Sequence, residues 1–137
     1  MKGKRQEDIL KRFTKRYSAA GSQTLDQVER AAIGAVVGAN GYTTVTQAER
    51  LFEVLNVQPG SWLLDIGAGR GWPGLYLAER SGCRAVVTDI PRAAIASANS
   101  RAEDLGLTGR CHLALAAGAA LPFRDASFDA VVHTDAL

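Results

Sequence analysis

An apolar run that leads into closely spaced glycines constrains this chain more than any other feature. Trp62–Ile66 is apolar except for Asp65, and glycines then stand at positions 67, 69, 71 and 74. The run predicts a buried strand, and the apolar, alanine-bearing segment beyond the glycines predicts a helix. In such a strand–loop–helix unit a ligand can come close to backbone N–H groups, because glycine has no Cβ to block its approach.

Two kinds of ligand fit this loop. Gly69-x-Gly71-x-x-Gly74 matches the dinucleotide fingerprint, whereas the same loop read from Asp65 has an acid at the end of its strand. A carboxylate beside a pyrophosphate is repelled by it, so Asp65 favours a ligand that presents a cation. The alternative is that Asp65 only accepts hydrogen bonds from the loop. We favour ligand contact, since a charge at the end of a buried strand needs a partner.

Strands and helices alternate after the loop. Residues 73–80 and 91–104 have helical patterns, and strands are predicted at 84–88, 111–116 and 128–132. This order predicts an α/β fold with a parallel sheet, whose ligands bind beyond the carboxyl ends of the strands. Asp65, Asp89, Gly118 and His133 all lie at the carboxyl ends of predicted strands and are therefore expected at that edge.

The segment before the loop is predicted to be helical. Residues 6–17 form one amphipathic pattern, and Thr24-x-x-Gln27 and Thr46-x-x-Glu49 are capping boxes for two further helices. The second helix is expected to run to Gly38 with Leu25 and Val28 facing inward. We therefore divide the chain into a helical cap or arm at 1–45 and a cofactor-binding domain at 46–137.

Charge is unevenly distributed along the chain. Every lysine lies within the first 15 residues, and residues 1–17 carry a net charge of +5 against −3 for the remainder. A basic segment of this kind can bind nucleic acid or another acidic partner, or can be a solvated helix face. We favour the solvated face, and do not expect a nucleic-acid partner, because the rest of the chain is not basic.

Composition indicates a cytoplasmic protein without a membrane segment. The 137 residues are 47% hydrophobic, and no apolar run approaches the roughly 18 residues of a membrane span. No apolar segment of a signal peptide follows the basic N-terminus. The cysteines, Cys83 and Cys111, have no metal-site spacing and are expected to be reduced thiols, so no metal is predicted.

Residues after the second and third strands suit a nucleoside. Asp89 can accept both hydroxyl groups of a ribose, or it can cap the helix that begins at Pro91; we favour the ribose. Ile90 is placed to lie against a purine. The small residues Gly118 and Ala119 can form the opposite wall, or only an ordinary turn.

The segments Asp65–Gly71, Asp89 and Leu121–Asp129 together resemble class I S-adenosylmethionine-dependent methyltransferases, most closely their small-molecule branch known as type 11. The resemblance covers about residues 45–137 and implies a Rossmann-like, doubly wound parallel sheet. It implies that Asp65 and the glycine loop hold the methionyl portion of S-adenosyl-L-methionine, Asp89 the ribose, and Ile90 with Ala119 the adenine. His133 is implied to lie beside the sulfonium, and Asp129 to order its loop. The cofactor-binding residues are thus expected to be Asp65, Gly67, Ala68, Gly69, Gly71, Asp89, Ile90, Gly118, Ala119 and His133.

The chain departs from the family pattern in two places. Ala117 stands where many members have an acid that binds the adenine amino group. The family's sheet has seven strands, whereas this sequence stops after about the fourth. We therefore expect a C-terminally truncated domain in which residues 128–132 form an exposed edge, open to self-association or to a partner chain.

The expected activity is methyl transfer to a small-molecule acceptor. The alternatives are a non-catalytic cofactor-binding fragment that acts through its exposed edge and, less favoured, an NAD-dependent oxidoreductase. No catalytic residue is assigned. His133 is a candidate base or a packing residue, and Asp135 a weaker candidate base. Tyr17 and Tyr42 are candidates for a lid or for packing on the sheet.

Overall fold

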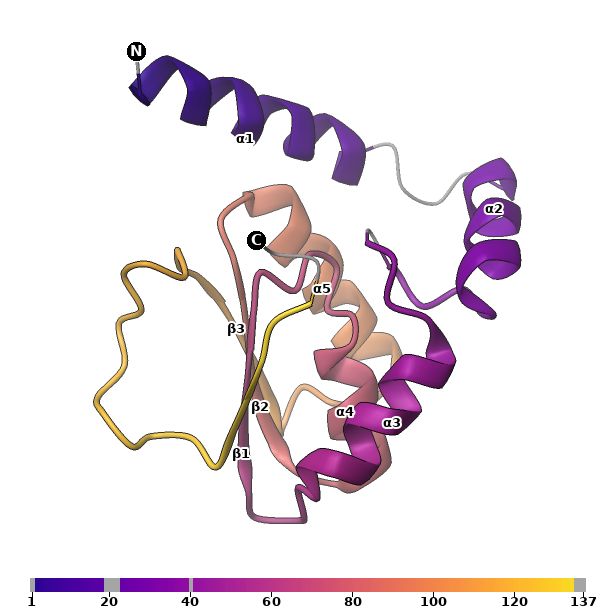
Figure 1. The fold of residues 1–137 in the computed structure, drawn as a ribbon, viewed down its shortest axis with the longest axis vertical. Coiled ribbons are helices and arrows are strands. Elements are labelled where there is room, and N and C mark those ends of the chain that lie inside the picture. Colours follow the sequence, from indigo (N-terminus) through magenta and orange to yellow (C-terminus); the bar gives the residue numbers. More distant parts are fainter. Residues whose placement is uncertain (1, 19–22, 40, 135–137) are drawn as a thin grey trace.

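A computed structural model describes residues 2–18, 23–39 and 41–134. At its centre is a parallel sheet in the order β3-β2-β1-β4 (Figure 1). The strands are β1 (Trp62–Ile66), β2 (Arg84–Asp89), β3 (Cys111–Leu115) and β4 (Ala130–Val132). The fold class predicted from the sequence, α/β with a Rossmann-like parallel sheet, is confirmed. The fourth strand is shorter than expected, because residues 128–129 precede it rather than belong to it.

Three helices cover one face of this sheet. α3 (Val45–Leu55), α4 (Gly74–Ser81) and α5 (Arg92–Asp104) lie on one side, and the connection 116–129 lies on the other (Figure 1). α4 and α5 share a face because successive parallel strands are joined by right-handed crossovers in the same direction. The main hydrophobic core lies between these helices and the sheet and includes Leu63, Leu77 and Val87.

The direction of winding changes at β1. β2 and β3 follow on one side of it, whereas β4 pairs on its other side, with Asp65 opposite Val132. The carboxyl ends of β1 and β4 therefore flank a topological switch point, which is where open α/β sheets bind their ligands. The glycine loop leaves β1 at this point.

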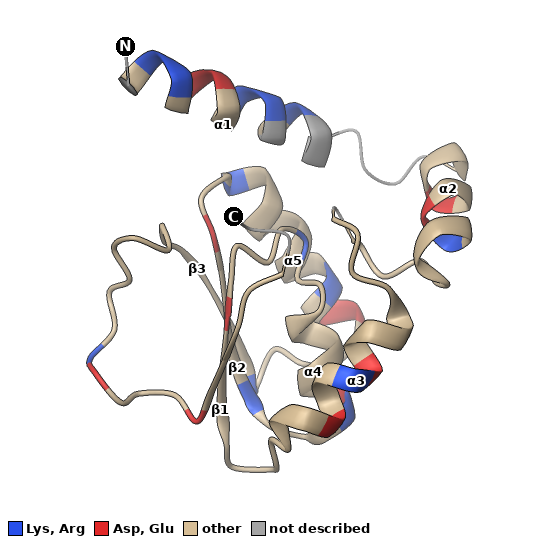
Figure 2. Ribbon diagram, in the orientation of Figure 1, with Lys and Arg blue, Asp and Glu red and all other residues tan. Residues whose placement is uncertain are grey.

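Two further helices, α1 (Lys2–Ser18) and α2 (Gln23–Ile33), lie beyond the end of the sheet at which the strands terminate (Figure 1). α1 runs beside α5. Its residues 3–12 are exposed, and it carries seven of the 16 Lys and Arg residues of the chain (Figure 2). None of the helices in the described ranges is both long enough and apolar enough to span a membrane.

The structure corrects two details of α2. The helix ends at Ile33, not Gly38, because Gly34 adopts a φ of 101° that an α-helix cannot contain. Leu25 and Val28 were expected to face inward, but they are 46% and 59% exposed. Their spacing marks an amphipathic helix correctly, yet no large surface of the described chain covers that face.

The capping boxes also differ from the expectation. Thr44 is the N-cap of α3: its side chain accepts the Gln47 N–H, and the Gln47 side chain accepts the Thr44 N–H. The cap therefore lies two residues before the predicted Thr46. Thr24 lies within the first turn of α2, so the box predicted there is also wrong. The predicted boundary between residues 45 and 46 falls at the start of α3 and stays a prediction.

Candidate cofactor-binding site

The glycine loop is held by hydrogen bonds of its own backbone. Ala68 donates its N–H to the Thr88 carbonyl of β2 at 3.0 Å, and the Ala68 carbonyl accepts N–H groups from Gly71 and Trp72 at 2.9 and 3.2 Å. Gly69 has a φ of 58°, which glycine adopts at little cost. The tight turn places the N–H groups of residues 67–71 at the carboxyl end of β1, where the sequence predicted them.

Asp65 lies beneath this loop and is completely buried. Its Oδ2 accepts the Gly74 N–H at 2.7 Å, whereas its Oδ1 accepts no hydrogen bond from any described residue. Burial raises the pKa of the Asp65 carboxyl well above its ordinary range; the Gly74 hydrogen bond lowers it, and the negative charge of Asp89 raises it. One oxygen of the carboxyl group therefore accepts a hydrogen bond from the loop, and the other is left to accept a hydrogen bond from a ligand.

Gly74 is required by this arrangement. A Cβ at position 74 would lie 2.5 Å from the Asp65 Oδ2 atom, closer than any real contact. The absence of a side chain at Gly74 therefore lets the Asp65 carboxyl group approach the backbone of the loop. This requirement accounts for the last glycine of the loop, a glycine that the dinucleotide fingerprint also contains.

Asp89 lies across the loop from Asp65, at the carboxyl end of β2. Its Oδ2 accepts the Gly69 N–H at 2.7 Å, and its Oδ1 accepts the Ile90 N–H at 2.7 Å. The alternative role as the cap of α5 is not observed, because the N-cap position is Pro91 and no side chain caps it. Each carboxylate oxygen has a second lone pair, so the group can still accept ribose hydroxyls.

The predicted adenine-binding residues lie at the same edge. Ile90 is 55% exposed, and Gly118 and Ala119 are also exposed. Gly118 lies against β1: a Cβ there would come within 3.1 Å of the Ile66 Cγ2 atom. His133 is exposed just beyond β4, and the pairing of Asp65 with Val132 brings it level with Ile66. The structure thus gathers the predicted residues at the ends of adjacent strands.

Other residues singled out from the sequence lie away from this edge. Asp129 accepts the Trp62 N–H at 2.7 Å at the opposite end of β1, so its predicted role in ordering the loop before β4 is confirmed. Tyr42 is 87% exposed, so it is not packed on the sheet, and its role as a lid stays a prediction. The Tyr17 side chain and Asp135 lie outside the described part of the chain.

Trp72 is an important site residue that the sequence analysis missed. It lies inside the glycine loop, is only 6% exposed, and donates its indole Nε1–H to the Thr43 carbonyl at 2.9 Å. Its ring packs with Ile33 and Ala48 and lies 5.2 Å from the Tyr76 ring, centroid to centroid. A large aromatic residue within a glycine loop was itself a signal, because it must be buried against some other segment.

With this geometry established, comparison with known proteins identifies the family. Residues 63–137 match the family described as "Methyltransferase domain", and the chain belongs to this family. It is 33% identical over 93 residues to 24-methylenesterol C-methyltransferase 2 of Oryza sativa subsp. japonica, covering 68% of this chain and 26% of that protein. It is 36% identical over 90 residues to 18S rRNA (guanine(1575)-N(7))-methyltransferase of Saccharomyces cerevisiae, covering 64% and 30%.

A solved structure gives the same result. The fold superposes on geranyl diphosphate methyltransferase in complex with SAM with a TM-score of 0.62 and 28% identity, covering 77% of this chain and 46% of that one. The chain therefore spans about a quarter to a third of the curated relatives that it matches. The predicted resemblance to class I methyltransferases and the predicted cofactor, S-adenosylmethionine, are confirmed.

The residues present fit this cofactor. Asp65 offers a cationic group a buried oxygen that accepts no hydrogen bond from the described residues, and Asp89 offers acceptors to a ribose. The comparisons do not favour either alternative considered from the sequence, the non-catalytic fragment or the NAD-dependent oxidoreductase.

Proposed function

We propose that this chain is the cofactor-binding part of an enzyme that transfers a methyl group from S-adenosylmethionine to a small-molecule acceptor. The observation that carries the proposal is the pair of carboxylates at the ends of β1 and β2, which bracket the glycine loop through Gly74 and Gly69. When bound, the cofactor supplies a methyl group already activated by its sulfonium. The protein's task is to hold the acceptor in line and exclude water.

Each carboxylate has a distinct role in the proposal. Asp65 takes the methionyl ammonium, because its Oδ1 is buried without a hydrogen-bond donor among the described residues. Asp89 takes the ribose hydroxyls, since it lies at the carboxyl end of β2 and is only half-buried. Ile90 and Ala119 lie on either side of the adenine, the backbone of residues 67–71 and Gly118 completes the cradle, and His133 lies beside the sulfonium.

Equilibrium dialysis with S-adenosylmethionine, S-adenosylhomocysteine and NAD tests the cofactor. We expect the first two to bind and NAD not to bind. Asp89→Ala should weaken binding about 10- to 100-fold, because it removes charge-assisted hydrogen bonds to both ribose hydroxyls. Asp129→Ala is the control: it removes a carboxylate that binds Trp62 at the far end of β1 and should leave affinity unchanged. Tight NAD binding without S-adenosylmethionine binding would falsify the proposal.

The acceptor class is supported by the relatives named for small molecules, a sterol and geranyl diphosphate, while another relative is named for 18S rRNA. Incubation of the chain with a cell extract and methyl-labelled S-adenosylmethionine separates these classes. We expect label in the organic-soluble fraction. Label confined to acid-precipitated RNA would assign a nucleic-acid acceptor instead.

A further inference from the structure

We propose that the indole of Trp72 is a positioning group through which the N-terminal cap holds the cofactor-binding loop. The inference rests on the proposed function of that loop, and it adds a dependence of cofactor affinity on the cap. Trp72 lies within the glycine loop. The residue comes three positions after Gly69, which bonds to Asp89, and two before Gly74, which bonds to Asp65. Any shift of its backbone therefore displaces both carboxylate contacts.

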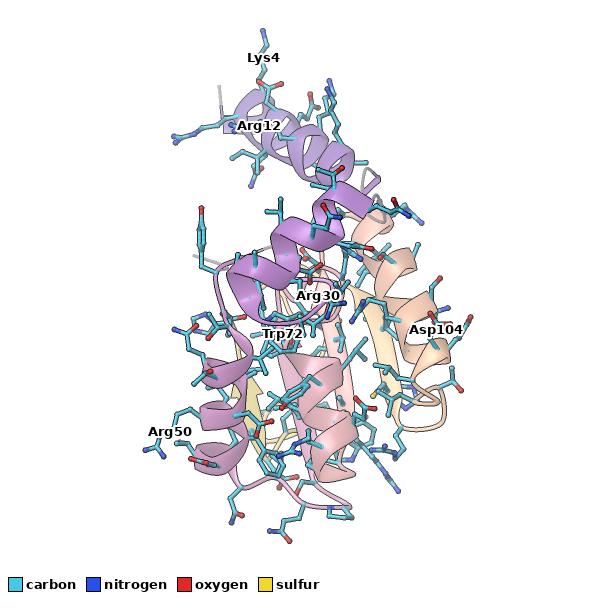
Figure 3. The ribbon with its side chains drawn as sticks, turned by 90° about the vertical axis from the view of Figure 1, so that its right-hand side faces the viewer. Lys4, Arg12, Arg30, Arg50, Trp72 and Asp104 are labelled. Carbon is cyan, nitrogen blue, oxygen red and sulfur yellow. The ribbon has the colours of Figure 1, made fainter. Side chains whose placement is uncertain are left out.

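The backbone of Trp72 is itself part of the loop's turn. Its N–H donates to the Ala68 carbonyl at 3.2 Å, and Ala68 in turn donates to Thr88 of β2. The side chain points the other way, out of the cofactor-binding domain and into the cap. Figure 3 shows Trp72 near the centre of the molecule, between the cap helices and α4.

The indole packs where the cap meets α3. Ile33 at the end of α2 and Ala48 of α3 form a small buried cluster with Trp72, and Val37 and Val45 pack around it. The Nε1–H donates to the carbonyl of Thr43, which is itself buried, one residue before the N-cap of α3. This hydrogen bond joins residues 29 positions apart in the chain.

A second contact joins α3 to α4 without passing through the loop. The Tyr76 hydroxyl of α4 donates to Glu49 of α3, and Arg80 also donates to Glu49, at 2.9 Å. Tyr76 contacts the Trp72 ring but lies beyond the loop's last glycine. The two contacts therefore differ in one respect that can be tested: only the Trp72 contact is anchored in the cofactor-binding loop.

The experiment measures S-adenosylhomocysteine affinity by titration calorimetry in the intact chain and three variants. Trp72→Phe keeps an aromatic ring but loses the N–H and leaves the buried Thr43 carbonyl without this donor; we expect about tenfold weaker binding. Tyr76→Phe removes one hydrogen bond between α4 and α3, outside the loop, and should change affinity less than twofold. Trp62→Phe, at the far end of β1, controls for loss of a tryptophan and should bind as the parent chain does.

A second measurement separates positioning from general loss of stability. Hydrogen exchange of the amides at 43–48 should slow when S-adenosylhomocysteine binds the parent chain, because binding and cap attachment are reciprocally coupled. In Trp72→Phe this protection should be lost while circular dichroism still reports a folded protein. The inference is overturned if Trp72→Phe binds as tightly as the parent, or if Tyr76→Phe weakens binding equally. If the parent chain itself binds no S-adenosylhomocysteine, the proposed function fails, and this inference fails with it.

Discussion

Asp65 combines complete burial with a carboxylate oxygen that accepts no hydrogen bond from the described residues. Burial first, and the charge of Asp89 after it, raise its pKa, although the Gly74 N–H opposes them. A neutral carboxyl costs less to bury than a carboxylate. A bound ammonium group reverses this preference, because a cation beside the carboxyl favours its charged form.

Replacement of Asp65 by asparagine tests the raised pKa of this carboxyl group. Because the folded-state pKa lies above the unfolded one, the carboxyl lowers the free energy of unfolding as the pH rises from about 4 toward the folded pKa. Asp65→Asn keeps an acceptor for Gly74 but cannot ionise. In urea unfolding, the variant should therefore gain stability relative to the parent as the pH rises from about 4 toward the folded pKa of Asp65. It should also bind S-adenosylhomocysteine about 10- to 100-fold more weakly. An identical pH dependence in both proteins would contradict the assignment.

Residue roles were predictable from the sequence only where they are local. Asp65 and Asp89 follow apolar runs directly, so the parallel-sheet rule brings them to one edge without further information. Trp72 was not predictable in this way, because its partners Thr43 and Ile33 are distant in the chain. The missing hydrogen bond of the Asp65 Oδ1 atom also depends on the packed structure, since the sequence does not show which donors reach it.

At the scale of elements, glycine and proline mark most boundaries correctly. Gly82 ends α4 in a left-handed conformation, as predicted, and Pro91 lies one residue before the start of α5. The prediction failed for α2, whose apolar spacing continues past its end at Ile33 into residues 35–37. Periodicity alone does not reveal that Gly34 stops the helix. Periodicity also did not show that Leu25 would be exposed.

The position of the α3 cap gives a matched pair of substitutions. Thr44→Ala removes the acceptor for the Gln47 N–H and should reduce the free energy of unfolding by about 1 kcal/mol. Thr46→Ala changes a threonine that the sequence nominated but that lies inside the helix, and it should change stability by about 0.5 kcal/mol or less. Chemical denaturation of the two variants compares them directly. Equal losses of the free energy of unfolding in the two variants would contradict Thr44 as the N-cap of α3.

At the scale of the whole molecule, the main feature is the unpaired edge of the sheet at β4. No strand of the described chain pairs with its outer side, and Val131 is 50% exposed. An unpaired apolar edge strand offers backbone groups to another chain. The expectation of self-association or of a partner at this edge, drawn from residues 128–132, now applies to Ala130–Val132 and stays a prediction.

Val131→Lys tests that edge. A lysine there opposes pairing of a second strand, so the variant should remain monomeric at concentrations where the parent associates. Light scattering after size-exclusion chromatography, at two protein concentrations at least tenfold apart, measures the difference. Val54→Lys makes the same change at a 63% exposed site on α3 and should behave as the parent does. A parent chain that stays monomeric throughout would show that this edge does not self-associate.

The confinement of every lysine to α1 has a practical consequence for spectroscopy. Lys4, Lys11 and Lys15 are exposed on that helix (Figure 2). An amine-reactive acceptor dye will therefore attach only to α1 or the terminal amine and leave residues 16–137 unmodified. With Trp62 replaced by phenylalanine, Trp72 becomes the single tryptophan donor. Energy transfer between them then reports the separation of the arm from the cofactor-binding loop, with no engineered cysteine and with the glycine loop unchanged.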